Sequence, residues 1–286
     1  MKKLLITGAH SYVGETVAEI LRNTWEVDTL DMRGDGWKQA DFSGYDAIFH
    51  VAGIVHLTGE KAKQAESLYH QVNTTLTIET AQKAKAEGVG QFIFMSSASV
   101  YGENGSLTSP KIITPDTPLA PVNAYGISKL NAETGLQELE DETFRVAILR
   151  PPMIYGKNCR GYYQTLSKLA QKLPVFPKVD NQRSMLYIGN LAEFVRLVLE
   201  NNARGIFCPQ DSETVNTSQM VSLIAEAHGK KMILVPGTLW ALKCLSKLTP
   251  LVDKAFGSLS YAPELSQYPQ NYCLWDLPQA IKETES

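Results

Sequence analysis

Short apolar runs alternate with segments of helical period through the first half of the chain. The apolar runs predict strands at residues 2–7, 26–31, 46–53, 91–97 and 144–150. The intervening periodicity predicts helices from about Tyr12, up to about Glu87 and from about Asn123. Buried strands that alternate with helices form a parallel sheet with crossover helices. The pattern therefore predicts an α/β fold built on a doubly wound parallel sheet of about six strands.

One predicted crossover is unusually short. The segment from Asp31 to Asp46 has no room for a full helix, and it contains Gly34, Gly36 and Gly44, which favour turns. We expect this connection to be a loop with a very short strand around residues 40–42.

The second half of the chain has a different character, because prolines after Arg150 divide it into short elements. We expect residues 1–155, together with about 185–205, to form a domain around the doubly wound sheet. Residues of about 156–184 and 206–275 are expected to form a smaller C-terminal cap.

Composition limits the partners. A chain of 286 residues with 44% hydrophobic residues can bury a sizeable core. A net charge of −3 and no basic run argue against nucleic acid as a partner. The apolar run from Leu4 to Ile6 is far too short for a membrane span or a secretory core, so no membrane partner is expected.

Cysteine and histidine usage excludes other classes of site. The four cysteines contain no CxxC pair, which favours neither zinc nor a disulfide framework and indicates a reducing cytoplasm. The five histidines lack metal-ligand spacing, so no metal is expected. His56 is interpreted as a partly exposed loop residue.

The stretch TGAHSYVG, from Thr7 to Gly14, follows a predicted strand and opens a helix. Glycines at such a turn let the backbone approach a phosphate, and the helix N-terminus presents N–H groups. Ser11 replaces the expected middle glycine, but a small side chain there can point away or offer its hydroxyl. The stretch, with Gly8 and Tyr12, predicts a dinucleotide pyrophosphate site. The alternative is a structural turn.

Asp31 ends the second predicted strand, 23 residues after Gly8. A carboxylate at this place can accept hydrogen bonds from the adenosine ribose hydroxyls and would repel a 2′-phosphate, so NAD is favoured over NADP. Arg33 stands two residues away and weakens that preference.

Tyr125 and Lys129 are spaced i, i+4 on a predicted helix and share one face. Lowering a tyrosine pKa from about 10 by about three units takes roughly 4 kcal/mol, which a close ammonium and a positively charged nicotinamide ring could supply. Ser97 ends a buried strand 28 residues earlier, at the edge where open α/β sheets hold ligands. The three residues predict a general base, its activating cation and a hydroxyl partner. A surface Tyr–Lys pair is the alternative.

These features occur with others in a fixed order from the first strand to about residue 200. The further matches are HVAG at 50–53, Asn73 in VNTT, SSASVYG at 96–102, YGISK at 125–129, LRPPMIYG at 149–156 and RSMLYIGNLA at 183–192. Together they resemble the extended short-chain dehydrogenase/reductase family. Within it the chain is most similar to the NAD-dependent sugar-nucleotide epimerase/dehydratase group, the relatives of UDP-glucose 4-epimerase.

The resemblance implies that the first domain is an NAD-binding Rossmann domain and that the cap binds the substrate. It also implies a role for each matching residue. Gly8, Ser11, Tyr12 and Gly14 would lie at the cofactor pyrophosphate and Asp31 at the adenosine ribose. Asp41 and Phe42 would lie near the adenine, Ala52 and Gly53 along the cofactor, and Lys129 at the nicotinamide ribose. Catalysis would use Ser97, Tyr125 and Lys129. The substrate would contact Ser97, Ser99, Tyr125 and Arg183, the last through the diphosphate.

Some positions depart from the family pattern. Met153 stands where better-known epimerases carry a substrate-binding asparagine, and Gly189 and Asn190 replace a common Asp-Asp pair. Family dehydratases carry Asp-Glu where this chain has Ala98 and Ser99, so it lacks the groups that would eliminate water.

The resemblance thus implies an NAD-dependent 4-epimerase of a UDP-hexose or UDP-N-acetylhexosamine, acting through a transient 4-keto sugar with Tyr125 as general base. The alternative is an NAD(P)H-dependent sugar-nucleotide 4-ketoreductase of a polysaccharide pathway. A non-catalytic dinucleotide-binding regulator is a third hypothesis. A cytoplasmic homodimer is expected.

Overall fold

The computed structural model describes residues 1–286 except 56–64, 103–104, 108, 160 and 249–250. The chain divides into two compact units. Unit 1 comprises Met1–Glu103, Pro118–Pro151 and Leu191–Cys208, and unit 2 comprises Asn104–Thr117, Pro152–Asn190 and Pro209–Ser286. The segment at 104–117 groups with unit 2, although the expected first domain included it, because β5 (Lys111–Ile113) pairs with β12 (Leu259–Tyr261).

Unit 1 contains a six-stranded sheet whose pairs are all parallel, in the order β10-β6-β4-β3-β1-β2. The strands are β1 (Lys3–Thr7), β2 (Glu26–Leu30), β3 (Ala47–His50), β4 (Gln91–Met95), β6 (Arg145–Leu149) and β10 (Gly205–Phe207). The predicted doubly wound α/β fold is therefore confirmed. The edge strand β10 escaped prediction because it is short and two of its three residues are exposed.

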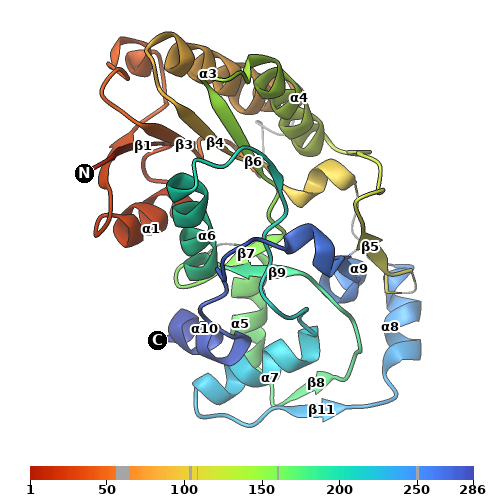
Figure 1. The fold of residues 1–286 in the computed structure, drawn as a ribbon. Coiled ribbons are helices and arrows are strands. Elements are labelled where there is room, and N and C mark those ends of the chain that lie inside the picture. Colours follow the sequence, from red (N-terminus) through yellow and green to blue (C-terminus); the bar gives the residue numbers. More distant parts are fainter. Residues whose placement is uncertain (56–64, 103–104, 108, 160, 249–250) are drawn as a thin grey trace. The chain divides into compact units, whose positions relative to one another are not determined.

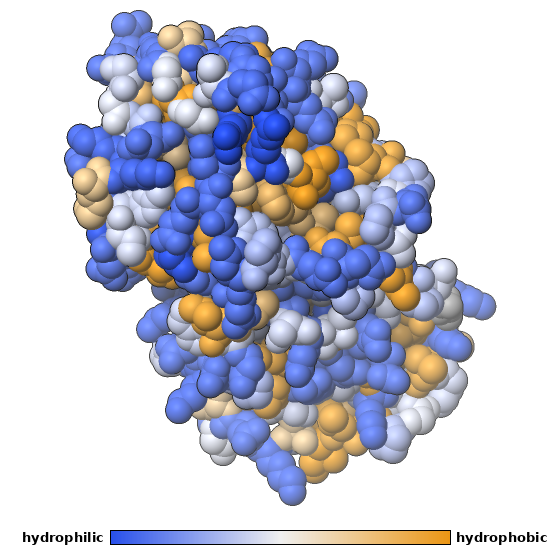
Figure 2. All heavy atoms as spheres, viewed as in Figure 1, coloured by the Kyte–Doolittle hydropathy of each residue, from blue (hydrophilic) through white to orange (hydrophobic). Residues whose placement is uncertain are grey.

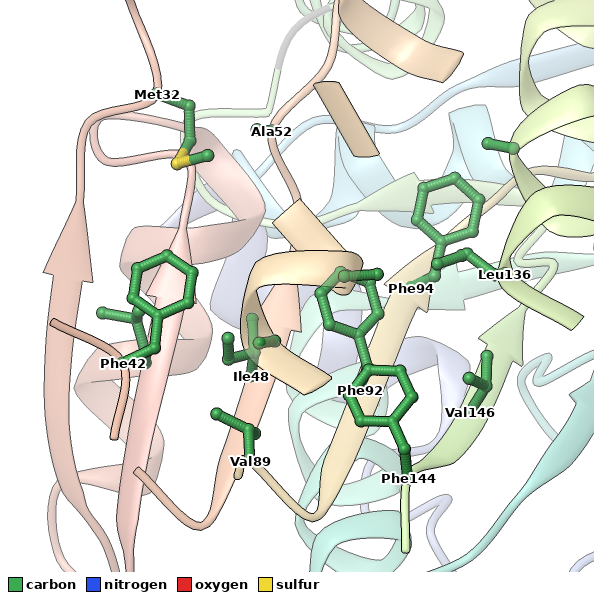
Figure 3. Close-up of a cluster of buried hydrophobic side chains, with 14 of the residues drawn as sticks. Met32, Phe42, Ile48, Ala52, Val89, Phe92, Phe94, Leu136, Phe144 and Val146 are labelled. Carbon is green, nitrogen blue, oxygen red and sulfur yellow. The ribbon is translucent and has the colours of Figure 1, made fainter. Parts of the chain in front are cut away.

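Helices cover both faces of this sheet. Figure 1 shows α3 (Leu76–Ala86) and α4 (Ala124–Leu139) on one face, with α1 (Tyr12–Leu21) and α6 (Ile188–Glu200) on the other. Beneath α3 and α4 lies a buried cluster to which Phe92, Phe94 and Phe144 contribute rings (Figure 3). The rings of Phe92 and Phe144 lie 6.1 Å apart. Burying these aromatic side chains fixes both helices against the sheet.

The connection from β2 to β3 differs from its prediction. The very short strand expected around residues 40–42 is wrong: a 3₁₀ turn, Gly36–Gln39, precedes an extended segment that pairs with no strand of the described chain. Trp37 in that turn is 3% exposed and packs into the core. A buried indole anchors the loop where no helix fits.

The long helix predicted up to Glu87 contains an interruption. α2 (Ala65–Tyr69) is followed by a π-helical segment, His70–Thr75, before α3 begins at Leu76. Such segments are rare and often occur at functional sites. This one contains Asn73, which is fully buried.

Unit 2 contains three parallel strand pairs: β5 with β12, β7 (Met153–Tyr155) with β9 (Met185–Tyr187), and β8 (Val175–Pro177) with β11 (Ile233–Val235). Its helices are α5 (Tyr162–Lys172), α7 (Thr217–Ala227), α8 (Leu239–Ser246), α9 (Leu251–Phe256) and α10 (Leu277–Glu285). Among the described residues of the chain, no helix combines the length and apolar character that crossing a membrane requires.

Candidate active site

The winding of the sheet changes direction between β1 and β3, and ligands of open α/β sheets bind at such a point. Gly8 follows β1 there with φ of +109°. A Cβ on Gly8 would lie 2.7 Å from the Ala52 backbone nitrogen, closer than atoms can pack. Gly8 is therefore required both by its conformation and by the approach of the segment after β3.

Ser11 caps the helix that follows this turn. Its Oγ accepts a hydrogen bond from the Gly14 backbone N–H at 3.0 Å, and α1 begins at Tyr12. A Cβ on Gly14 would lie 2.6 Å from that same Oγ and 3.0 Å from Val51 Cγ2. Ser11 thus performs the capping that the pattern could not reveal, and it leaves the helix N-terminus directed at the switch point.

Asp31 follows β2 and is held by Arg33. The guanidinium Nε lies 3.0 and 2.9 Å from the two carboxylate oxygens, and Nη2 lies 2.5 Å from Oδ2. Hydrogen bonds from Arg33 lower the pKa of Asp31 to about 2, so its carboxylate is ionised at neutral pH. Both side chains are substantially exposed, which leaves oxygen lone pairs open to a ribose.

Asp41 and Phe42 follow the 3₁₀ turn and have opposite environments. Asp41 is exposed, and a hydrogen bond with Ser43 lowers its pKa. The Phe42 ring is fully buried in the core of unit 1, and its backbone N–H donates to Glu87 at 2.6 Å. Only the surface of this segment that Asp41 presents is open to a ligand.

Ser97 and Tyr125 come from different elements. Ser97 follows β4 and begins a 3₁₀ turn, while Tyr125 lies in the first turn of α4, whose N-cap is Asn123. Burial raises the pKa of Tyr125, and a hydrogen bond with Ser97 opposes this effect. The direction is opposite to the lowering expected from the neighbouring Lys129 ammonium, because removal of the phenol from water outweighs the other effects. Ser99 Oγ, two residues along the turn, is buried and has no hydrogen-bond partner within the described residues. Such an atom is the kind of group that a bound ligand satisfies.

Lys129 lies one turn of α4 after Tyr125 and is 4% exposed. Its Nζ donates to the Met95 carbonyl at 2.8 Å and sits 4.6 Å from the centre of the Phe94 ring. Burial lowers the pKa of Lys129 to about 8, against an opposing attraction to Glu133. A Cβ on Gly53 would lie 3.4 Å from Nζ, so the ammonium borders the segment after β3.

The π-helical segment His70–Thr75 holds α4 against the segment that follows β3. Asn73 Oδ1 accepts from the Ile54 N–H at 2.9 Å, and its amide donates to the Ile54 carbonyl and to Ser128 Oγ. Ser128 donates in turn to the Tyr125 carbonyl at 2.8 Å. Tyr69 packs edge-on against the Tyr125 ring. Asn73 therefore ties the segment after β3 to the helix that carries Tyr125.

His50, at the end of β3, belongs to a buried polar chain. Its Nδ1 lies 2.7 Å from Thr7 Oγ1 and its Nε2 3.1 Å from Thr77 Oγ1. Thr77 already donates its proton to the Asn73 carbonyl, so Nε2 donates to Thr77 and Nδ1 accepts from Thr7. Burial, with Lys129 nearby, lowers the pKa of His50 to about 3. His50 is thus a neutral connector rather than a proton carrier.

A buried ion pair lies behind the catalytic candidates. Glu133 is 1% exposed and Arg150 is 5% exposed. Arg150 Nη2 lies 2.6 Å from Glu133 Oε2, and Nε contacts both carboxylate oxygens at 3.1 Å. Ser96 Oγ also donates to Glu133, and Arg150 Nη1 donates to the Tyr101 hydroxyl at 2.8 Å. The pair connects α4, the end of β4 and the end of β6.

Arg183, predicted at the substrate diphosphate, belongs to unit 2. It is 6% exposed, and its guanidinium lies 5.0 Å from the centre of the Tyr162 ring. Its backbone pairs with Val215 in both directions. Burial lowers the pKa of Arg183, although a guanidinium remains charged throughout the useful pH range.

The unusual Gly189-Asn190 pair has a local explanation in unit 2. A Cβ on Gly189 would lie 2.5 Å from the Tyr187 ring and 3.1 Å from Trp275. Asn190 donates to Asp211 at 2.8 Å and exchanges two hydrogen bonds with the Trp275 backbone. These residues anchor the segment around Trp275.

Sequence reasoning missed Tyr69, Ser128, Glu133 and Arg150. The available signals were Glu133 four residues after Lys129 on one helical face and Arg150 at the end of an apolar run. His56 lies outside the described residues. Within the described part of the chain, no group of three or more His, Cys, Asp or Glu side chains is placed to bind a metal.

Comparison with known proteins identifies relatives along the chain. Residues 4–216 match the family described as the NAD dependent epimerase/dehydratase family. The UDP-glucose 4-epimerase of Vibrio cholerae is 30% identical, over 99% of this chain and 93% of that protein. The N-acetyl-α-D-glucosaminyl-diphospho-ditrans,octacis-undecaprenol 4-epimerase of Escherichia coli O157:H7 is 29% identical, over 80% of this chain and 73% of that protein.

Among solved structures, the UDP-glucuronic acid 4-epimerase of Bacillus cereus in complex with NAD has the same fold. It superposes with a TM-score of 0.73 at 18% identity and covers 99% of this chain and 97% of that one. The extended short-chain dehydrogenase/reductase resemblance expected from the motifs is confirmed.

The turn after β1 generates the first prediction. Gly8→Val should abolish dinucleotide binding and lower the melting temperature, because its Cβ would collide with Ala52. Ser11→Ala should cost about 1 kcal/mol of unfolding free energy, and Ser11→Gly a few tenths, with dinucleotide binding retained in both. Thermal unfolding and equilibrium dialysis measure the two quantities. Full binding by Gly8→Val would show that the site lies elsewhere.

The buried pair generates the second prediction. Arg150→Met leaves the Glu133 charge buried without its partner and should cost about 3–5 kcal/mol of unfolding free energy. Glu133→Gln with Arg150→Met should cost less than the sum of the single variants, because neither charge is then stranded. Urea unfolding of the four proteins gives the coupling energy. Additive effects would mean that the two side chains act independently.

The buried ammonium generates the third prediction. Because folding lowers the Lys129 pKa to about 8, its charged form opposes folding below pH 8. That penalty falls as pH rises from about 8 to the unfolded value near 10.4. Lys129→Met should therefore stabilise the cofactor-free protein by about 1–2 kcal/mol at pH 7, after loss of the bond to Met95. The gain should disappear above about pH 10.5. A gain independent of pH would contradict this account.

Proposed function

Because the chain belongs to the NAD-dependent epimerase/dehydratase family, we propose that it is a sugar-nucleotide 4-epimerase acting on a UDP-hexose or UDP-N-acetylhexosamine. The observation that carries the proposal is the similarity to the Vibrio cholerae UDP-glucose 4-epimerase over 99% of this chain. The similarity includes the second half of the chain, where a substrate cap was expected.

The residues of unit 1 suit NAD. The close approach of Gly8 to Ala52 leaves bare backbone at the switch point, and the capped N-terminus of α1 favours a pyrophosphate there. The ionised Asp31 carboxylate would accept hydrogen bonds from the ribose hydroxyls. Gly53, which borders Lys129 Nζ, would face the nicotinamide end. When bound, NAD supplies the hydride acceptor and donor for the sugar C4.

Tyr125 is the proposed general base. As the phenolate, its oxygen would take the proton of the sugar 4-hydroxyl and later return it, while Ser97 would hydrogen-bond the same sugar oxygen. Lys129 supplies positive charge beside this proton transfer. Its ammonium is fixed by the Met95 carbonyl, and it stays protonated at neutral pH because its pKa is about 8.

Two further groups are assigned to the substrate. Ser99 Oγ is buried and has no hydrogen-bond partner in the described structure, so a sugar hydroxyl would supply its missing hydrogen bond. Arg183 offers a forked donor set suited to a diphosphate. After β4, Ala98 and Ser99 stand where family dehydratases carry carboxylates, so the described site has no acid–base pair there for dehydration.

A lipid diphosphate is a second candidate for the group that carries the sugar. The Escherichia coli relative is named for a sugar on an undecaprenyl diphosphate, and it matches 80% of this chain. Both kinds of substrate join the sugar to a diphosphate, which is the part that Arg183 would bind.

The four cysteines are present as thiols rather than disulfides, which suits a reducing cytoplasm. We propose that the enzyme works there, and a homodimer remains the expected assembly.

The fourth prediction tests the activity. Purified protein should interconvert UDP-glucose with UDP-galactose, or their N-acetylated forms, without net change in NADH absorbance. Tyr125→Phe should lower kcat by about 10²–10⁴-fold with NAD content unchanged. Tyr45→Phe, which removes a hydroxyl bonded to Asp28, is the matched control and should retain full activity.

Other outcomes separate the alternatives. Stoichiometric NADH consumption with a 4-keto sugar nucleotide would favour the 4-ketoreductase. Conversion of undecaprenyl-diphosphate-linked N-acetylglucosamine alone would favour the lipid diphosphate. If no substrate is converted and Tyr125→Phe changes no cellular phenotype, a non-catalytic regulator replaces the epimerase.

A further inference from the structure

α8 in unit 2 presents an apolar face to solvent. Leu242 is its buried side chain, at 9% exposure, whereas Trp240 is 72% exposed, Leu245 46% and Leu248, just after the helix, 83%. At about 100° per residue, these three exposed side chains fall within an arc of about 140°. Lys243 and Lys247, both exposed, flank one edge of this arc.

The strand pair that leads into α8 is also apolar on its outer side. β8 and β11 pair in register, with Val175 opposite Ile233, and these residues are 47% and 56% exposed. Val235 is 38% exposed, while Phe176 turns to the buried side. Figure 2 shows hydrophobic side chains at the edge of unit 2 where Figure 1 places β8, β11 and α8.

The charge of this region contrasts with the rest of the chain. Residues 161–179 and 229–248, which include α5, β8, β11 and α8, contain seven lysines and no Asp or Glu in a chain of net charge −3, and Asp180, Glu226 and Asp253 lie just beyond them. Those lysines are Lys168, Lys172, Lys178, Lys230, Lys231, Lys243 and Lys247. None of the ion pairs among the described residues includes one of them.

We propose that the exposed residues of α8, β8 and β11, here called the basic apolar face, dock on the surface of an anionic lipid bilayer. Exposed tryptophan and leucine side chains suit the headgroup boundary, and lysines beside them pair with anionic headgroups. A second copy of the chain would place lysines against lysines. An acidic protein would leave Trp240 and Leu248 poorly matched.

The contact is peripheral and reversible, because α8 is short and neither its apolar area nor its charge is sufficient alone. No membrane partner was expected from the sequence, because its apolar runs are too short to span a bilayer, and the apolar stripe at Trp240, Leu242, Leu245 and Leu248 was interpreted as cap packing or a dimer face. The structure instead leaves Trp240, Leu245 and Leu248 exposed. The proposal concerns where the protein resides, and it is independent of the reaction in unit 1.

The fifth prediction is measured by co-sedimentation of the full chain with vesicles. Vesicles of phosphatidylcholine with about one-third phosphatidylglycerol should bind it at least about tenfold better than phosphatidylcholine alone, with binding weakened by salt. Tryptophan emission should shift to the blue on binding. Trp240→Phe should still bind but lose most of this shift, because Trp25 and Trp37 are already buried and Trp275, half-buried, packs against Tyr187 outside the face.

Charge reversal supplies the decisive comparison. Lys243→Glu with Lys247→Glu should lower binding to the anionic vesicles by at least about tenfold and leave activity on a soluble sugar nucleotide unchanged. The matched control reverses Lys157 and Lys282, two exposed lysines outside the face, and should bind as the unmodified chain does. An equal loss of vesicle binding in the control would show that net charge alone explains the effect.

Three results would overturn the proposal. The chain could fail to prefer anionic vesicles. The emission shift could persist in Trp240→Phe, which would place the contact elsewhere. Sedimentation without vesicles could show a dimer that Lys243→Glu with Lys247→Glu dissociates, which would assign the face to a second copy.

Discussion

The ion pair between Glu133 and Arg150 is the constraint on which the geometry of unit 1 depends. Two charges that are almost fully removed from water are tolerable only when each is fully hydrogen-bonded. Glu133 accepts hydrogen bonds from Arg150 and Ser96, and Arg150 also donates one to Tyr101. One carboxylate therefore fixes α4 against the ends of β4 and β6. Tyr125 and Lys129 lie on the same helix, and Ser97 directly follows Ser96. The relative placement of the proposed catalytic groups is thus set by a contact that none of them makes.

Electrostatic balance within the site follows from the same arrangement. Lys129 is buried between an aromatic ring, a carbonyl and a neutral histidine, and its charge is supported by Glu133 four residues away. The Thr7–His50–Thr77 chain satisfies polar atoms without adding a charge. In the proposed reaction, the site would combine one mobile proton, on Tyr125, with cations and dipoles that stay fixed. The buried Lys129 ammonium destabilises the empty protein, and the proposed reaction would use its charge.

The features that could be predicted from the sequence are those that a local pattern of residues determines. The strands of unit 1 are continuous apolar runs, and the turn from Gly8 to Gly14 has the residues that its backbone requires, so both were readable. The roles of Asn73 and Arg150 were not, because each depends on a partner far along the chain: Ile54 and Ser128 for one, Glu133 for the other. β5 could not be paired from sequence, since its partner β12 lies almost 150 residues away. The strand expected around residues 40–42 failed because a buried tryptophan fixed a different turn.

The π-helical segment His70–Thr75 has a consequence for the helix that contains it. A π turn holds one residue more than an α turn, so it changes the rotational phase of everything that follows. α2 presents Tyr69 to the Tyr125 ring, whereas α3, in a different phase, presents Ala81 and Ala84 to the core between the helix and the sheet. The π turn thereby sets the facing of Tyr69 apart from that of Ala81 and Ala84. One continuous helix can then contact the candidate site at its start and pack into the core at its end.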